Sequence, residues 1–102
     1  MQVSAGFQMF AQEAPAEQAA WMEAVQKLDA ASHLDQKTKD LAYIAILAAV
    51  RLDGGLPFHV KMAKAHGATR AEVLSSILLG LPAVGNAVMQ SLPVALAAYD
   101  QE

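Results

Sequence analysis

The chain contains no cysteine among its 102 residues. This absence excludes a disulfide scaffold, a thiolate metal site and any reaction that uses a thiol as its nucleophile. Charged residues are also scarce, at 17%, and the net charge of −3 comes without any run or stripe of Lys and Arg. Such a charge pattern gives little support to nucleic-acid binding, so we expect no nucleic-acid partner.

Long apolar runs are missing as well. The longest, Leu41–Val50, has ten residues, whereas a helix needs about 20 to cross a bilayer. The first six residues carry no positive charge ahead of an apolar stretch, so we expect no signal peptide. The sequence therefore predicts no membrane partner and a cytoplasmic location.

Hydrophobic residues, by contrast, make up 55% of the chain. A domain of this size has much surface for its volume and cannot hide so many apolar side chains inside itself. We therefore expect a homo-oligomer in which copies of the chain cover one another. The length predicts one domain over residues 1–102, with residues 1–13 as an N-terminal tail.

The sequence predicts an all-α fold of five to six helices, because it shows no period-two alternation and is rich in helix-forming residues. Pro15 suits the first turn of a helix that runs to about Ala31. Apolar residues recur along this helix at spacings of three and four, which predicts a core or interface stripe. The stripe consists of Trp21, Ala24, Val25 and Leu28.

Asp35 predicts the N-cap of a second helix over residues 36–52, which Asp53, Gly54 and Gly55 would end through positive φ angles. Because this helix is apolar on nearly every side, we expect it to be central and buried by its neighbours.

Three further helices are predicted. One runs from Pro57 to Gly67, and a capping box at residues 69–72 starts the next, which ends near Leu79. After a bend at residues 80–82, a last helix over residues 83–99 would kink or split near Leu92, ahead of Pro93.

The three histidines differ in their surroundings. His33 lies in a polar connection and His66 at a helix end, so both are interpreted as structural or solvated. His59 follows a Gly-Gly turn and sits among Phe58, Val60 and Met62. Two interpretations stand for it: a core imidazole bonded to a backbone carbonyl, or a functional group.

A metal site and an organic cofactor are not expected. His59 and His66 lie two helical turns apart, about 10 Å along the axis, which is too far to share one ion. The sequence also has no Gly-rich phosphate loop and no dinucleotide fingerprint.

Asp40 is the natural partner to consider for His59. If the two central helices pack antiparallel, the start of one lies far from the start of the other, so a direct bond within one chain is not implied. A water bridge or a contact across a subunit boundary stays open, and Asp40 could instead simply charge the start of its helix. Any such pairing would raise the pKa of His59. Lys37, Lys39 and Lys61 are interpreted as solvated side chains.

The order of several short motifs resembles the carboxymuconolactone decarboxylase family, which includes the alkyl hydroperoxidase D-like proteins. The similarity covers roughly residues 10–98. Its motifs are residues 34–41, the apolar helix that follows, and residues 57–63, 67–73 and 80–87. The resemblance implies an alkyl hydroperoxidase D-like helical fold and assembly into trimers or hexamers.

The peroxidase branch of that family carries Cys-x-x-Cys-x-x-x-His, with an acidic residue nineteen positions before the histidine. His59 matches the histidine and Asp40 the acid, whereas Leu52 and Gly55 stand at the two cysteine positions. A relay position between the cysteines is Gly54. The resemblance therefore excludes thiol peroxidase chemistry and points to the decarboxylase branch.

That branch implies a cofactor-free acid/base reaction on a small carboxylated molecule, with His59 and Asp40 as the candidate catalytic residues. Arg51, Lys61 and Arg70 are loose candidates for binding a carboxylate, since none forms a recognisable anion clamp. The alternative is a non-catalytic oligomeric binder or scaffold that has kept the fold. For a functional His59 we expect a small apolar cavity near a subunit boundary, also lined by Phe58, Met62 and residues around Leu81.

Overall fold

Local start signals in the sequence account for most helix boundaries in the computed structural model, which describes residues 3–101. The elements are α1 (Ala5–Glu13), α2 (Pro15–Ala31), α3 (Gln36–Ala49), η1 (Asp53–Gly55), α4 (Leu56–Ala65), α5 (Arg70–Leu78), α6 (Leu81–Val84), η2 (Gly85–Ser91) and α7 (Leu92–Asp100), where η marks a 3₁₀-helix. The described residues contain no strand, so the predicted all-α fold is confirmed.

The predicted caps are in place. The Asp35 carboxylate accepts a hydrogen bond from the backbone N–H of Thr38 at 2.8 Å and begins α3. Thr69 and Glu72 form the reciprocal capping box that begins α5. Pro15 lies in the first turn of α2, where its missing N–H leaves no intrahelical bond unmade.

The expected tail contains a helix. Ser4 accepts a hydrogen bond from the N–H of Phe7 and caps α1. Phe7 and Phe10 then meet edge to face one turn apart, with their ring centroids separated by 6.4 Å. Residues 5–13 therefore form a short apolar helix, where the sequence analysis assigned none.

The end of α3 differs from the prediction. The helix stops at Ala49, and Arg51 adopts the positive φ, 62°, that was expected of the glycines. Its guanidinium fixes this turn through Asp53, at 2.9 Å, and the hydroxyl of fully buried Ser91, at 3.0 Å. Gly55 instead has an ordinary φ of −89°. A long-range polar network, and not glycine freedom, therefore shapes this turn.

The predicted last helix is divided before its proline. Gly85, with φ 73°, ends α6, and residues 85–91 continue as the 3₁₀-helix η2. Pro93 then lies in the first turn of α7, where it fits without a kink. The predicted split near Leu92 is therefore confirmed, whereas the second division, at Gly85, was not predicted.

The core lies between α3, α4, α5 and α7, which pack directly on one another. Its largest fully buried apolar side chains come from all of these segments except α7, with η2 contributing one. They are Ile44, Leu56, Val60, Val73, Ile77 and Val88. Ala95 and Ala98 of α7 complete the cluster, so α7 approaches its neighbours closely through small residues.

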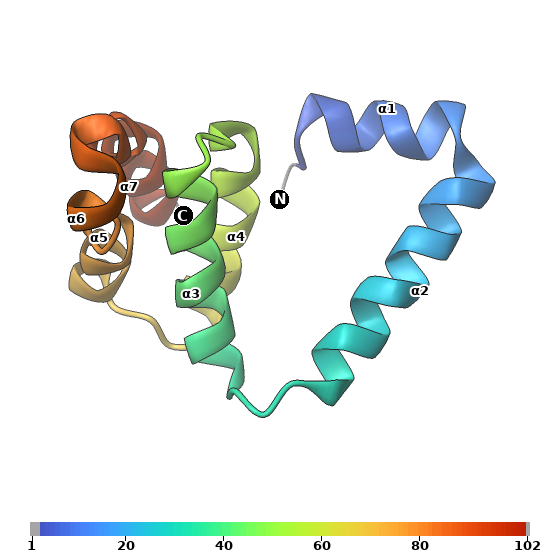
Figure 1. Cartoon of the computed structure of the whole chain (residues 1–102), viewed down its shortest axis with the longest axis horizontal. Coiled ribbons are helices and arrows are strands. Elements are labelled where there is room, and N and C mark those ends of the chain that lie inside the picture. The colour runs from blue at the N-terminus through green and yellow to red at the C-terminus, as the bar shows by residue number, and fades with distance from the viewer. Residues whose placement is uncertain (1–2, 102) are drawn as a thin grey trace.

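Helices α1 and α2 form an arm that lies apart from this bundle (Figure 1). Neither helix contains a buried residue, and each packs chiefly against the other. The predicted stripe on α2 is uncovered, with Trp21 57% and Leu28 70% exposed. In the single chain the stripe is therefore not part of a core.

Helix α3 is buried on one side only. Ile44 and Ala48 are fully buried, but Tyr43, Ile46 and Val50 are 46%, 55% and 57% exposed. The expectation of a helix buried on all sides is therefore wrong for the single chain.

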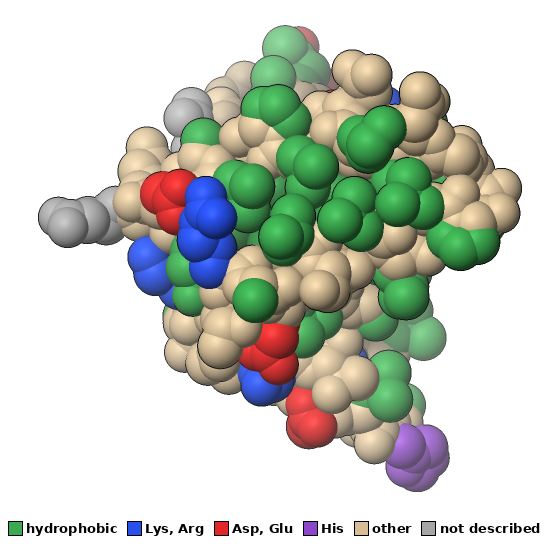
Figure 2. Space-filling view, turned by 90° about the vertical axis from the view of Figure 1, so that its left-hand side faces the viewer, with side chains coloured by type: hydrophobic (Ala, Val, Ile, Leu, Met, Phe, Trp, Pro, Cys, Tyr) green, Lys and Arg blue, Asp and Glu red, His purple; other side chains and the backbone are tan. Residues whose placement is uncertain are grey.

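The C-terminal part of the chain is apolar enough, by length and composition alone, to cross a membrane. An 18-residue window within residues 70–100 reaches a mean hydropathy of 1.5, and only 17% of that window is buried. In the structure this stretch is divided into α5, α6, η2 and α7, and α5 packs against α7. It forms a bent layer of the bundle with much apolar surface on its outer side. Figure 2 shows hydrophobic side chains gathered on this side of the molecule.

Candidate functional site

His59 lies in the first turns of α4, half-buried between two aromatic rings. Its ring centroid is 4.5 Å from that of Tyr43 on α3 and 5.2 Å from that of Phe58. The C-terminal half of α3 runs beside the N-terminal half of α4, and Gly55 leaves room next to the imidazole. Two helices and a small residue thus hold the ring in place through its flat faces and edges.

Both ring nitrogens of His59 reach solvent. Among the described residues neither nitrogen has a hydrogen-bond partner, and no buried side-chain nitrogen or oxygen there lacks one. Within residues 3–101, therefore, nothing seals either nitrogen from water. His59 is therefore not a sealed core histidine bonded to backbone carbonyls, which was one of the two interpretations from sequence.

Burial lowers the pKa of His59 below its ordinary value of 6.5, and the carboxylate of Asp40 partly opposes this. Asp40 thus acts in the expected direction, but loss of solvent around the ring is the larger effect. The expected rise in the pKa is therefore wrong in sign. At neutral pH the imidazole is uncharged, the form that accepts a proton.

This lowered pKa predicts a specific loss of stability in acid. The unfolded chain binds a proton at His59 near pH 6.5, whereas the folded chain binds it only at lower pH. The free energy of unfolding should therefore fall as the pH drops from about 7 to about 5, and fall less in His59→Gln. Urea denaturation at both pH values measures the difference.

The matched control is His33→Gln, because His33 lies exposed in the loop between α2 and α3. This variant should follow the parent chain. If His59→Gln keeps the whole pH dependence of the parent, the imidazole is not desolvated as described.

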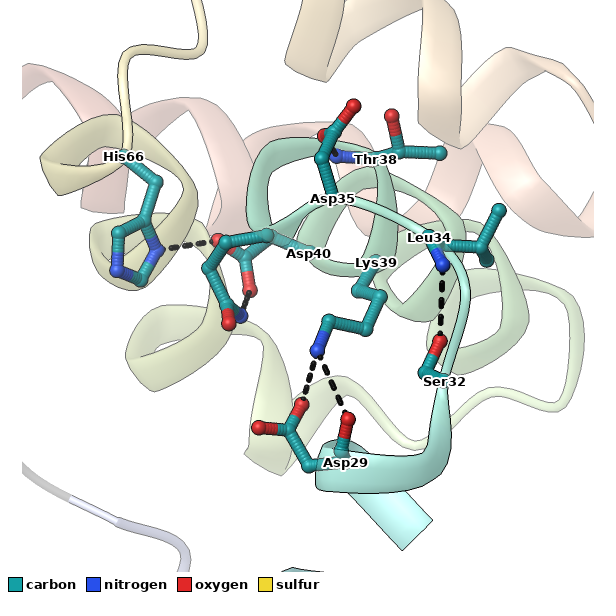
Figure 3. Close-up of polar contacts among 9 residues, drawn as sticks. Asp29, Ser32, Leu34, Asp35, Thr38, Lys39, Asp40 and His66 are labelled. Carbon is teal, nitrogen blue, oxygen red and sulfur yellow. Dashed lines mark hydrogen bonds and ion pairs between the residues drawn. The ribbon is translucent and has the colours of Figure 1, made fainter.

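Asp40 is paired with His66 and not with His59. Its Oδ2 lies 2.6 Å from His66 Nδ1, and its Oδ1 accepts a hydrogen bond from Gln36 Nε2 at 3.0 Å (Figure 3). The side chain is only 9% exposed, so these contacts replace most of its water. A direct Asp40–His59 bond is absent, and the influence of Asp40 on His59 is electrostatic.

The pairing follows from the direction of the helices. Asp40 lies in the second turn of α3, and His66 is the C-cap of α4. Antiparallel packing brings those two ends together. Antiparallel packing that separates Asp40 from the start of the next helix necessarily places it beside the end of that helix, so the pairing with His66 could have been predicted from the sequence.

The two lysines near Asp40, Lys37 and Lys39, both form ion pairs. Lys37 pairs with Glu72 at 3.0 Å, and Lys39, only 20% exposed, lies 2.6 Å from Asp29 on α2 (Figure 3). The prediction of a solvated side chain is therefore wrong for Lys39, whereas Lys37 is paired but stays 41% exposed. Lys39 links the arm to the bundle.

Two of the three candidate carboxylate-binding cations are already occupied. Arg51 binds Asp53, and Arg70 makes a bidentate pair with Asp100 at 2.8 and 3.0 Å. Lys61 has no hydrogen bond or ion pair within residues 3–101. It follows His59 by two residues, however, which turns it about 200° around the helix. Within residues 3–101 the chain thus brings no free Lys or Arg side chain to the side of His59.

A shallow open pocket lies elsewhere, between α3 and α5. Its lining residues are Leu41, Ala71, Glu72, Ser75, Ser76 and Leu79. Neither His59 nor Phe58 lines it, so the cavity expected beside His59 stays a prediction for the assembled protein. Within the described part of the chain no three His, Asp or Glu side chains gather as a metal site.

One comparison supports the predicted family and its helical fold. A model of the carboxymuconolactone decarboxylase family matches residues 15–97, a range that contains α2 to α6 and both His59 and Asp40. No curated protein and no solved structure matches the chain.

Proposed function

The chain belongs to the carboxymuconolactone decarboxylase family, and we propose that it performs acid/base chemistry on a small carboxylated molecule with His59 as the proton carrier. The observation that supports this most is the state of His59: a neutral imidazole held between Tyr43 and Phe58, with both nitrogens open to solvent. A positioned imidazole of this kind contributes about 10²- to 10⁴-fold to proton transfer.

In a decarboxylation of a small acid, the His59 imidazole would carry the proton that replaces the lost CO₂. The bond between carbon and carboxylate breaks, CO₂ leaves, and the electron pair stays on the carbon, spread into a neighbouring carbonyl. That carbon must then take up a proton. The neutral His59 takes up one proton from the solvent for each CO₂ released and passes it to the carbon, so the imidazole ends as it began.

The fixed groups around His59 suit a flat, partly apolar substrate. Tyr43 and Phe58 offer ring faces and edges, and the lowered pKa of His59 keeps a positive charge off the ring at neutral pH. Asp40 acts through its field only, because both of its oxygens are bound to other side chains. In this proposal Asp40 is therefore a positioning residue for the α3–α4 pair.

The alternative is a non-catalytic oligomeric binder or scaffold. What favours it is that the described residues bring no free Lys or Arg to the His59 side, since Arg51 and Arg70 are paired and Lys61 lies on another face of α4. In either case we expect copies of the chain to assemble, as a trimer or hexamer, and a small organic acid to be the ligand.

The direct test is an assay of the purified protein with carboxymuconolactone, the compound in the family's name, following release of CO₂. Release above a heat-denatured sample supports the enzyme. If no CO₂ appears, a thermal-shift series with small mono- and dicarboxylic acids separates the binder from a scaffold. A binder melts at higher temperature with one of them, and a scaffold does not respond.

Thiol-dependent peroxide reduction should be absent. The family's peroxidase chemistry needs one thiolate to attack the peroxide and a second thiol to resolve the product, and this chain has no cysteine. With a dithiol reductant and an alkyl hydroperoxide, peroxide should disappear no faster than with heat-denatured protein. Faster consumption would mean that another residue carries redox chemistry.

A further inference from the structure

A second imidazole, outside the His59 site, is held in place by a buried acid. His66 Nδ1 lies 2.6 Å from Asp40 Oδ2, and the Asp40 side chain is only 9% exposed. Gln36 Nε2 donates a hydrogen bond to the other carboxylate oxygen, Oδ1, at 3.0 Å. The carboxylate is therefore fixed through both of its oxygens, and it fixes the orientation of the imidazole in turn.

The contact with Asp40 decides which nitrogen of His66 carries the ring proton. An ionised carboxylate only accepts hydrogen bonds, so Nδ1 must be the donor. In the neutral ring the lone pair then lies on Nε2. Figure 3 shows the second ring nitrogen on the side away from Asp40, and no residue within 3–101 bonds to it. The pair thus presents a free lone pair at a defined position.

The surface beside His66 is open to small molecules. The His66 side chain is 34% exposed, and Gly67 follows it with a φ of 94°. A Cβ built on Gly67 would meet no atom within 4 Å, so no side chain of the described residues crowds this position. A small molecule can therefore reach Nε2 directly from solvent.

Positive charge that develops on this ring is stabilised from two directions. The Asp40 carboxylate lies against Nδ1, and His66 is the C-cap of α4, where the helix dipole places partial negative charge. When Nε2 forms a bond to carbon the ring becomes an imidazolium, and both groups favour that product. The two side chains therefore have the arrangement of a nucleophile or base and the acid that orients it.

The backbone after His66 limits which molecules could react. The N–H of Gly67 donates to the Lys64 carbonyl at 3.1 Å. The N–H of Ala68 donates to the Ala63 carbonyl at 2.9 Å. Neither group is available to stabilise negative charge on a carbonyl oxygen, as an oxyanion hole would. A substrate must therefore be activated already, with a leaving group that departs as a stable anion.

We propose that His66, oriented by Asp40, is a second catalytic site, which transfers acyl groups from small activated esters to water. Nε2 attacks the carbonyl carbon, the bond from that carbon to the leaving oxygen breaks, and this oxygen keeps the electron pair. Water then attacks the acyl group, the carbon–nitrogen bond breaks, and its electron pair returns to Nε2. For an aryl ester each cycle consumes one ester and one water and releases a carboxylate, an aryloxide and two protons. The reaction does not involve His59.

Labelling of the parent chain tests the nucleophile without any substitution. Diethyl pyrocarbonate transfers an ethoxycarbonyl group to an unprotonated imidazole nitrogen. In mildly alkaline buffer His66 should react about 10-fold faster than His33, which is exposed in the loop between α2 and α3. His66 should also stop at one group per ring, because Nδ1 is bound to Asp40. Peptide mass spectrometry measures both, and labelling of His66 no faster than His33 would overturn the proposal.

Hydrolysis of 4-nitrophenyl acetate tests the turnover, since the colour of 4-nitrophenolate reports each cycle. The parent chain should hydrolyse the ester faster than free imidazole at equal concentration. His66→Gln should lower this rate by about 10-fold or more, and Asp40→Asn by about 3-fold or more. His33→Gln is the matched control and should retain the parent rate. Circular dichroism checks that the variants fold, and the labelling result decides the proposal if a substitution at this pair weakens the fold.

Full ester hydrolysis by folded His66→Gln, or a loss confined to His59→Gln, would also overturn the proposal. The role of His59 is measured by release of CO₂ from a carboxylated substrate, and that of His66 by labelling and by a neutral ester. Either site can therefore fail its test without affecting the other.

Discussion

His59→Gln should lower turnover of the carboxylated substrate by about 100-fold or more, while the free energy of unfolding at neutral pH stays close to that of the parent chain. Glutamine retains a polar side chain of moderate size but cannot carry a proton in this pH range. Because both ring nitrogens of His59 face solvent, the substitution breaks no hydrogen bond within the described part of the protein. Activity and stability are therefore expected to separate.

Two measurements and one control variant make the test decisive. Turnover of CO₂ gives the activity, urea denaturation gives the stability, and His33→Gln serves as the same substitution in an exposed loop. The His33 variant should match the parent chain in both. Full activity of His59→Gln would remove His59 from the reaction. A large loss of stability would instead show that the imidazole is a packing residue, held by Tyr43 and Phe58 for structural reasons.

The fold could be predicted wherever a boundary depends on neighbouring residues alone. Pro15, Asp35 and the Thr69–Glu72 pair act within one helical turn of themselves, and each starts a helix where expected. The missed helix α1 had the same kind of signal, because Ser4 precedes an apolar pattern, but the segment was interpreted as a tail.

Other features depend on residues far apart in the chain. Arg51 holds a positive φ because Asp53 and Ser91 bind its guanidinium, and Ser91 lies forty positions later. Local sequence rules would assign a positive φ to Gly54 or Gly55, three and four residues later, and not to an arginine. The exposure of the α2 stripe likewise depends on which surface packs against it, and residues close in sequence do not determine that. An apolar stripe predicts that a helix is covered, but it does not indicate whether the same chain supplies the cover.

The candidate site was predicted in part. His59 was singled out because it is a lone imidazole among apolar residues, and the structure places it between two aromatic rings. Its partner was wrong, because the acid nineteen residues before it in the family pattern is bound to His66. The sign of the pKa shift was wrong for a related reason. The prediction included the carboxylate charge of Asp40, which raises the pKa of His59, but not the burial of the ring, which lowers it more.

A double-mutant cycle on Asp40 and His66 should show strong coupling between them. Asp40→Asn and His66→Gln should each lower the free energy of unfolding by about 1–3 kcal/mol, because each removes a charge-assisted hydrogen bond of a largely buried carboxylate. The double variant should cost little more than either single one. Chemical denaturation of all four proteins gives a coupling energy of about 0.5–3 kcal/mol if the contact is as described.

Asp35→Asn is the matched control for the acid, since it makes the same chemical change one turn earlier. Asn caps a helix about as well as Asp, so this variant should differ from the parent by only a few tenths of a kcal/mol. Additive effects at Asp40 and His66 would contradict the pairing.

The same cycle run with His59 in place of His66 assigns Asp40 to one histidine. With no bond between them, Asp40→Asn and His59→Gln should be additive in stability to within about 0.5 kcal/mol. Coupling to His66 alone would establish Asp40 as the residue that ties the start of α3 to the end of α4. Any loss of turnover in Asp40→Asn would then arise through the position of these helices or through the field at His59, since the carboxylate makes no contact with that ring. Coupling to His59 instead would restore the pairing that the family pattern suggests.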